Sequence, residues 1–283
     1  MLALVLLSMI IVTGASVRLS GSGLGCSDWP NCEAGELIQV SNRNQAIEQI
    51  NRLFTVLVAL GVIVAILGSI WRVPRRKDLT QISLALVAGV LLQGVIGGIT
   101  VLLELQWQSV AVHFLASIVL VSAGLVLHRR AGETPGPFEQ LVSKPTLFAA
   151  RTLLGLAAWV LVAGTLVTAS GPHGGDRVAT RLSWSIPTTA QLHSVSVWIL
   201  IALVLVVFVM LRREGAPRES LRCIEALLLI GVAQAALGYY QYFNGIPALA
   251  VGFHVAGAVA VFAAAQWLQF TLRRPTGSET MAE

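Results

Sequence analysis

Charged residues are scarce in this sequence. Asp, Glu, Lys and Arg make up 12% of its 283 residues, against roughly 25% in ordinary soluble domains. Hydrophobic residues make up 55%, a balance that excludes a soluble globular protein. The formal net charge of +5 would suggest a nucleic-acid partner in a soluble chain. Here the basic residues lie in short segments beside apolar runs, so we expect no nucleic-acid partner.

Apolar runs of about 20 residues, the length that crosses roughly 30 Å of hydrocarbon, recur along the chain. The sequence therefore predicts an all-α membrane protein with eight transmembrane helices. We interpret the first run as a retained helix and not as a cleaved signal peptide. The runs fall near residues 2–19, 52–71, 79–103, 107–127, 148–168, 190–211, 222–243 and 247–270.

Basic residues are unequally distributed between the two sides of this arrangement. One side holds 14 of the 19 basic residues. Because cytoplasmic loops are enriched in Lys and Arg, we expect a multi-pass protein of the cell membrane with both termini in the cytoplasm. The loops 20–46 and 169–189 would then lie outside. The side with few basic residues holds Arg18, Arg43, Arg52, Arg177 and Arg181.

The two halves of the chain resemble each other. Residues 13–16 align with 163–166, and Asn51-Arg52 aligns with His193-Ser194. A longer match, with identical spacings of 4 and 16 residues, pairs Gln93, Gly97 and His113 with Gln234, Gly238 and His254.

This repeat predicts two tandem four-helix bundles related by an axis along the membrane normal. The N-terminal half would comprise residues 1–130 and the C-terminal half residues 148–283, joined by a cytoplasmic linker at 131–147. A cofactor site should then occur twice, once in each half.

Three histidines lie at a similar depth near the outer ends of the fourth, sixth and eighth apolar runs: His113, His193 and His254. Ionisable side chains within membrane spans are costly, so each needs a reason. His193 and His254 belong to different helices of one half, an arrangement in which two imidazoles clamp a haem iron. The alternative is a pair of interhelical hydrogen-bonding residues. We expect the remaining two, His128 and His173, to be solvent-exposed.

The N-terminal half offers His113 and Asn51 at the corresponding positions, and therefore one imidazole. Glu48 stands three residues before Asn51 and four before Arg52. One interpretation of Glu48 is an ion pair with Arg52 at the start of a helix. The other is an acid near an open haem site, where it exchanges protons with the substrate.

Two of the three cysteines, Cys26 and Cys32, lie in the first outer loop. Because that loop faces an oxidising side, a disulfide is expected. It would serve either as a structural staple or in redox exchange.

Taken together, these segments resemble the haem A synthase family. The resemblance covers essentially the whole chain. Its motifs are TGASVRLSGSGLGCSDWPNC at 13–32, EQINR at 48–52, QGVIGG at 93–98 and the three outer histidines. Many members of the family carry a histidine where this chain has Asn51.

The resemblance implies an eight-span oxidoreductase that oxidises the C8 methyl group of haem O to a formyl group through hydroxylation. The product would be haem A for cytochrome oxidase assembly. Its partners would be haem O, with haem O synthase as the candidate donor, and membrane lipid, and we leave a homo-oligomer open. The alternatives are a quinol-linked membrane cytochrome b that does not modify its haem, and a transporter built on the repeat.

The resemblance also implies roles for single residues. It implies a haem b with axial ligands His193 and His254, a substrate haem at His113 and Asn51, a functional carboxylate at Glu48, and an outer-loop pair of Cys26 and Cys32.

Overall fold

The computed structural model describes residues 1–33, 35–38 and 40–276. Eight of its helices are long and apolar enough to cross a membrane. The prediction of an all-α, eight-span protein is therefore confirmed, and the chain is a multi-pass membrane protein. The helices are α1 (Leu2–Leu19), α2 (Arg43–Trp71), α3 (Lys77–Leu102), α4 (Trp107–Gly132), α5 (Lys144–Ser170), α6 (Ile186–Arg213), α7 (Arg218–Phe243) and α8 (Ala248–Thr271).

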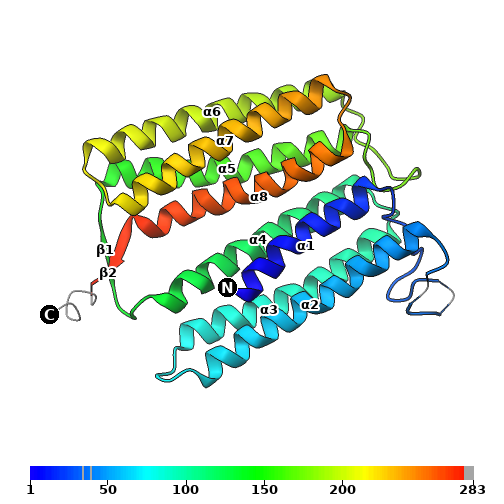
Figure 1. The fold of residues 1–283 in the computed structure, drawn as a ribbon, viewed down its shortest axis with the longest axis horizontal. Helices are drawn as coiled ribbons and strands as arrows, with labels where there is room; N and C mark the ends of the chain where they lie inside the picture. Colours follow the sequence, from blue (N-terminus) through cyan, green and yellow to red (C-terminus); the bar gives the residue numbers. More distant parts are fainter. Residues whose placement is uncertain (34, 39, 277–283) are drawn as a thin grey trace.

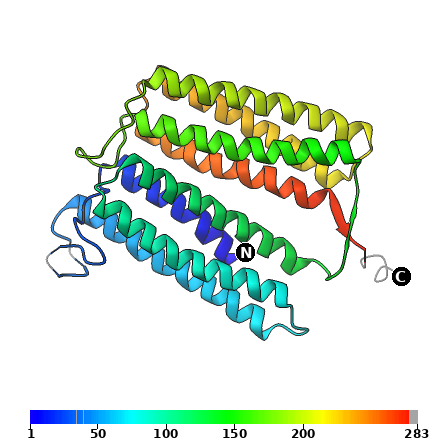
Figure 2. The same ribbon diagram turned by 180° about the vertical axis from the view of Figure 1, so that it is seen from behind.

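The helices pack as two sets of four. Consecutive helices contact each other within α1–α4 and within α5–α8, and the last helix of each set returns to the first. Each set is thus an up-and-down four-helix bundle, and the two bundles lie side by side (Figures 1 and 2). They meet where α8 contacts α1 and α4, and where α4 contacts α5. The symmetry axis inferred from the repeat stays a prediction.

Two apolar cores hold the bundles together. One core lies within the second bundle. The other fills the first bundle and continues across the interface, where Leu161 of α5 and Val259 and Phe262 of α8 join it. The side-chain amide of Gln266 also crosses the interface and donates to the carbonyl oxygen of Ser122 at 3.0 Å. The two bundles therefore share buried apolar surface and are not independent units.

Helix α2 begins nine residues before the apolar run that predicts it. The side chain of Asn42 accepts a hydrogen bond from the backbone N–H of Gln45 at 3.0 Å and caps the helix. A hydropathy window does not register these polar outer turns, whereas a capping residue specifies them. Glu48 and Asn51 consequently stand within the helix, beyond its first turn.

A small antiparallel sheet joins the segment between the bundles to the end of the described chain. Strand β1 (Phe138–Gln140) pairs with β2 (Arg273–Pro275), and the Arg273 guanidinium lies 4.2 Å from the centroid of the Phe138 ring. The sheet lies at one end of the molecule, and the loops 20–33 and 171–185 lie at the other (Figure 1). Three-residue strands carry too little pattern for the sequence to predict them.

Candidate functional site

Two histidine rings face each other inside the second bundle. His193 lies seven residues into α6, and His254 lies six residues into α8. Their ring centroids are 6.2 Å apart, with an interplanar angle of 73°. The Nδ1 atom of each ring is buried and has no hydrogen-bond partner within the described chain. Because buried polar atoms in proteins are nearly always paired, the two rings call for a ligand between or beside them.

The separation of these rings suits one metal ion held between them. A metal–imidazole nitrogen distance is about 2 Å, so two rings on opposite sides of one ion have centroids a little over 6 Å apart. No cluster of three or more His, Cys, Asp or Glu residues with metal-site geometry occurs among the described residues. A haem iron needs only two protein ligands, because the porphyrin supplies the rest. His193 and His254 therefore fit a haem iron.

Each ring of the pair lies directly on a glycine of the neighbouring helix. A Cβ atom added to Gly164 of α5 would stand 3.3 Å from Cε1 of His193. One added to Gly238 of α7 would stand 3.5 Å from Cε1 of His254. The repeated Gly and His spacing thus has a physical reason, since the small residue makes room for the imidazole of the next helix.

The first bundle repeats one half of this arrangement. A Cβ atom added to Gly97 of α3 would stand 3.2 Å from Cε1 of His113, and the Nδ1 atom of His113 is also buried without a partner among the described residues. The amide of Gln93 donates to the carbonyl oxygen of His113 at 3.0 Å. This bond joins α3 to α4, as expected of an interhelical glutamine.

The second position of the first bundle is different. Unlike the histidines, Asn51 has a hydrogen-bond partner, because its Oδ1 accepts a hydrogen bond from the Thr13 hydroxyl at 2.8 Å. Gly14, which aligns with Gly164, has no described atom within 4 Å of an added Cβ. Where the second bundle seats an imidazole on a glycine, the first bundle leaves space.

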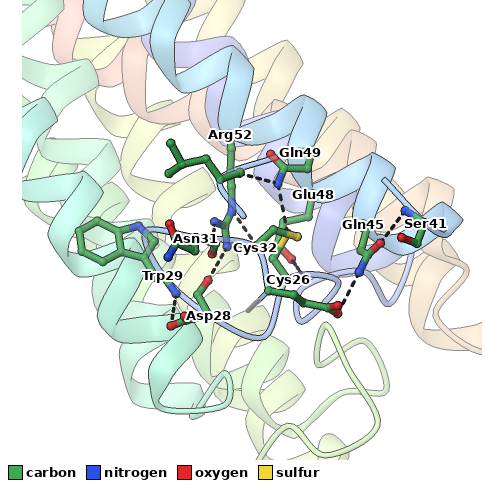
Figure 3. The surroundings of a disulfide bond; sticks show 12 residues. Cys26, Asp28, Trp29, Asn31, Cys32, Ser41, Gln45, Glu48, Gln49 and Arg52 are labelled. Carbon is green, nitrogen blue, oxygen red and sulfur yellow. Dashed lines mark hydrogen bonds and ion pairs between the residues drawn. A yellow bond between two sulfur atoms is a disulfide. The ribbon is translucent and has the colours of Figure 1, made fainter. Parts of the chain in front are cut away.

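The first outer loop is closed by a disulfide between Cys26 and Cys32, as expected. Both cysteines are fully buried. The loop lies over the outer end of α2 (Figure 3), where the Gln49 amide donates to Sγ of Cys26 at 3.5 Å and to the carbonyl oxygen of Leu37 at 3.2 Å. The structure places this disulfide in a tightly held loop.

Glu48 and Arg52 hold that loop onto α2. The carboxylate of Glu48 accepts the backbone N–H of Cys26 at 2.8 Å and pairs with the Arg52 guanidinium at 2.8 Å. The expected ion pair is therefore present, and Glu48 is buried. Arg52 donates in addition to the carbonyl oxygens of Asp28 and Asn31, each at 3.1 Å (Figure 3). It also donates to the carbonyl oxygen of Pro30 at 3.2 Å. The catalytic role of Glu48 stays a prediction.

The loop also covers the outer end of α3. The Trp29 ring lies against Gly98, where an added Cβ would come within 2.4 Å of the ring. Gly98 is the neighbour of Gly97, on which His113 is seated. The sequence reasoning missed this contact, although the paired glycines at 97 and 98 were a signal that two large rings approach α3 there.

The two other histidines are less exposed than expected. His128 is half-buried and stacks on Trp267, with ring centroids 6.0 Å apart. His173 is half-buried as well, and its Nε2 lies 2.7 Å from the carbonyl oxygen of Ile246. The prediction of solvent-exposed rings is wrong for both, because each is held by a partner from a distant part of the chain.

Comparison with known proteins gives two matches. A family model described as COX15-CtaA, cytochrome oxidase assembly protein, matches residues 1–173, which is more than half of the chain. A curated protein of Chloroflexus aurantiacus, protoheme IX farnesyltransferase, is 29% identical over 164 residues. The match covers 57% of this chain and 27% of that protein, so the chain spans about a quarter of the length of the curated relative that it matches.

Proposed function

Because the chain belongs to the COX15-CtaA family of cytochrome oxidase assembly proteins, we propose that it is a haem A synthase. The reaction oxidises the C8 methyl group of haem O to a formyl group through hydroxylation. We place the protein in the cell membrane with both termini in the cytoplasm, because 14 of the 19 basic residues fall on that side.

The observation that carries this proposal is the pair of facing imidazoles, His193 and His254, with centroids 6.2 Å apart. We assign these side chains as the axial ligands of a resident haem b. The haem supplies one-electron redox chemistry within the membrane. The chain itself fixes the orientation of both rings by seating them on Gly164 and Gly238.

We assign the first bundle to the substrate. His113 offers one imidazole for the iron of haem O, and the space beside Gly14 leaves room that a second imidazole would take. Asn51 is oriented by a hydrogen bond from Thr13, the residue before Gly14. An apolar isoprenoid tail is compatible with entry from the lipid, since the outward faces of the helices are apolar.

For Glu48 we propose two roles. It anchors the disulfide loop through Cys26 and Arg52, and it remains the carboxylate that lies closest in sequence to Asn51. A buried acid at the outer end of α2 can exchange protons with a substrate held in the first bundle. The Cys26–Cys32 pair can either staple the loop or exchange reducing equivalents.

The supply of substrate follows from the second match. The relative's name, protoheme IX farnesyltransferase, describes an enzyme that transfers a farnesyl group to protohaem. We propose an enzyme of that class, a haem O synthase, as the partner that delivers haem O to this chain.

The decisive experiment is haem extraction from cells that make haem O but lack their own haem A synthase. Expression of this chain should produce haem A, identified by chromatography and mass. A His113→Ala variant should accumulate haem O instead, and a His128→Ala variant, altered at the other end of the same helix, should behave as the wild type.

Two other outcomes would contradict the proposal. If the folded protein accumulates haem O with no haem A, it is not a haem A synthase. If it contains two unmodified haems and oxidises quinol, the alternative of a membrane cytochrome b electron carrier is correct.

A further inference from the structure

Two arginines approach each other at the outer end of the molecule. Arg18 lies in the last turn of α1, and Arg181 lies in the loop between α5 and α6. The Arg18 guanidinium donates to the carbonyl oxygen of His173 at 2.7 Å. The Nη2 atom of Arg181 is buried and has no hydrogen-bond partner within the described chain. The two side chains pack against adjacent glycines, Arg181 against Gly174 and Arg18 against Gly175.

Adjacent glycines leave room for these two side chains. A Cβ atom added to Gly174 would stand 2.5 Å from Nη1 of Arg181, and one added to Gly175 would stand 3.4 Å from Cγ of Arg18. The backbone N–H of Gly23 donates to the carbonyl oxygen of Gly175 at 2.9 Å. The arginines therefore lie in a well-packed region where the outer loops of the two bundles are hydrogen-bonded to each other.

This pair of cations has no acidic partner in the described part of the chain. The ion pairs found there involve other arginines, and the one at the outer end joins Arg52 to Glu48. Burial lowers the pKa of Arg181. Burying a charge without compensation is costly, and two like charges side by side raise that cost. An anion between them would remove it.

The position of the pair indicates which bundle such an anion belongs to. His173, whose carbonyl oxygen holds Arg18, reaches with its ring to Ile246 in the turn between α7 and α8. Leu19, the neighbour of Arg18, touches α8 at Gly252, where an added Cβ would stand 3.5 Å from Leu19. Gly252 precedes His254 by two residues, so Arg18 lies near the outer end of α8, the helix that carries His254.

The depth of the two histidines fits an amphipathic ligand that reaches from His193 and His254 to the two arginines. His254 lies six residues into α8, about 9 Å along the helix axis. Haem carries two carboxylates on one edge and an apolar remainder. Guanidinium groups bind carboxylates through paired, charge-assisted hydrogen bonds.

We propose that Arg18 and Arg181 bind the carboxylates of the porphyrin held between His193 and His254, and so fix its edge toward the outer surface. This inference rests on the proposed function. It adds that a helix of the first bundle, α1, completes the cofactor site of the second.

The experiment compares protohaem IX with its dimethyl ester, in which the carboxylates carry no charge. Purified protein from haem-deficient cells is titrated with each porphyrin, and the low-spin bis-imidazole absorbance is followed. Arg181→Gln and Arg18→Gln should each lower the preference for the free acid over the ester by about ten- to a hundredfold, as expected for hydrogen bonds to a charged group. Affinity for the ester should stay unchanged.

Matched controls separate charge from folding. Arg177→Gln alters an exposed arginine of the same loop and should keep the wild-type preference. Arg181→Lys retains the charge and should fall between the wild type and Arg181→Gln. Detergent partition of the two porphyrins cancels, because preferences are compared between variants.

The outcomes distinguish this inference from the proposed function. If the wild type binds porphyrin with a bis-imidazole spectrum but Arg18→Gln and Arg181→Gln leave the preference unchanged, the arginine assignment is wrong and the haem site stands. If the arginine variants alter only a signal that His113→Ala abolishes, the carboxylates belong to the first bundle and the assignment is also wrong. If the folded wild type binds no porphyrin, the proposed function itself fails.

Discussion

The second bundle presents two imidazoles to each other, whereas the first presents one imidazole and a space. His193 and His254 are each seated on a glycine of the neighbouring helix, and so is His113. At the fourth position stands Asn51, which Thr13 holds toward α1. The same four-helix framework therefore carries two neighbouring imidazoles in one copy and one imidazole beside an open space in the other. In the proposed function, the first arrangement holds a resident cofactor, and the second leaves one side of the substrate iron without an imidazole.

The outer loops differ in the same sense. The loop over the first bundle is closed by the Cys26–Cys32 disulfide and anchored by Glu48 and Arg52. The loop over the second bundle is held by bonds to other segments, such as that from the His173 ring to Ile246. The first bundle, which has the open space, thus has the more strongly tethered outer loop.

The largest expected effect is the loss of the closed site. His193→Ala removes one of the two proposed iron ligands, so we expect the low-spin bis-imidazole signal to disappear and the haem content to fall by one per chain. Pyridine haemochrome quantification and electron paramagnetic resonance measure both. His128→Ala, which removes an imidazole at the other end of the molecule, should keep the full content. Retention of the signal in His193→Ala would show that the two bundles do not differ as we describe.

The second prediction converts the open site into a closed one. In Asn51→His the new imidazole has room beside Gly14, where no described atom lies within 4 Å of an added Cβ. We expect a second bis-imidazole signal, with haem A production retained, since many members of the family carry a histidine at this position. The reciprocal variant His193→Asn should leave one imidazole in each bundle. An unchanged spectrum of Asn51→His would mean that residue 51 does not face the site.

The third prediction concerns the tethered loop. Arg52→Ala breaks the pair with Glu48 and three bonds to loop carbonyl oxygens. Breaking a buried ion pair costs about 3–5 kcal/mol. The Arg52 side chain is 23% exposed, so we expect a loss at the lower end of that range.

Hydrogen exchange of the segment around Cys26 and thermal unfolding in detergent measure this loss. Arg43→Ala, an exposed arginine in the first turn of the same helix, provides the control. Equal exchange in the two variants would remove Arg52 from its anchoring role.

The fourth prediction tests the glycine seats. Gly164→Ala places a Cβ atom 3.3 Å from the His193 ring, whereas Gly14→Ala meets no described atom within 4 Å. We expect Gly164→Ala to weaken haem binding in the second bundle severalfold by shifting the ring. Gly14→Ala should preserve binding and stabilise α1 by roughly 0.5–1 kcal/mol. Porphyrin titration and thermal unfolding would contradict the comparison if the two alanine variants proved indistinguishable.

The smallest expected effect lies at the opposite end of the bundles. Helix α1 begins without a side-chain cap, whereas α5 begins at Ser143, whose hydroxyl and N–H donate to Glu214 at 2.6 and 3.0 Å. Hydrogen bonds from Ser143 and Thr146 hold the pKa of Glu214 below its usual range. The ionised form therefore stabilises the folded protein above the unfolded-state pKa of about 4.3. That contribution is lost as the pH falls through the lower folded-state pKa.

Thermal unfolding as a function of pH measures this contribution, which we expect to be less than about 1 kcal/mol because Glu214 is exposed. Glu214→Gln should make the unfolding temperature less dependent on pH between about pH 5 and about pH 3, the range in which carboxylates titrate. If the wild type and Glu214→Gln gave the same curve, ionised Glu214 would not stabilise the start of α5.

Much of the fold could be predicted from the sequence. The apolar runs located all eight helices, because a membrane requires each span to satisfy its own backbone hydrogen bonds over a fixed length. The helix ends were less accessible, as the start of α2 at Arg43 shows, since polar capped turns lie outside a hydropathy signal. The pairing of β1 with β2 joins segments more than 130 residues apart, and neither strand carries a pattern of its own.

The residues of the candidate site were also found from the sequence, while their relations were not. Repeated spacings selected His113, His193 and His254, because a local helical register is written in the order of residues. The close approach of two rings from diagonal helices, with an interplanar angle of 73°, depends on how four helices pack. The contact between Trp29 and Gly98 and the approach of Arg18 to Arg181 likewise join distant segments, so no spacing in the sequence could indicate them.

The order of residues by itself determined that the chain crosses a membrane eight times and that its halves repeat a glycine and histidine pattern, because hydropathy and helical periodicity act over neighbouring residues. Only the tertiary structure decided that one bundle brings two imidazoles together while the other keeps a space, and that an arginine of α1 binds the loop between α5 and α6. Those features arise from side chains of separate helices meeting at fixed distances, which packing and not sequence proximity brings about.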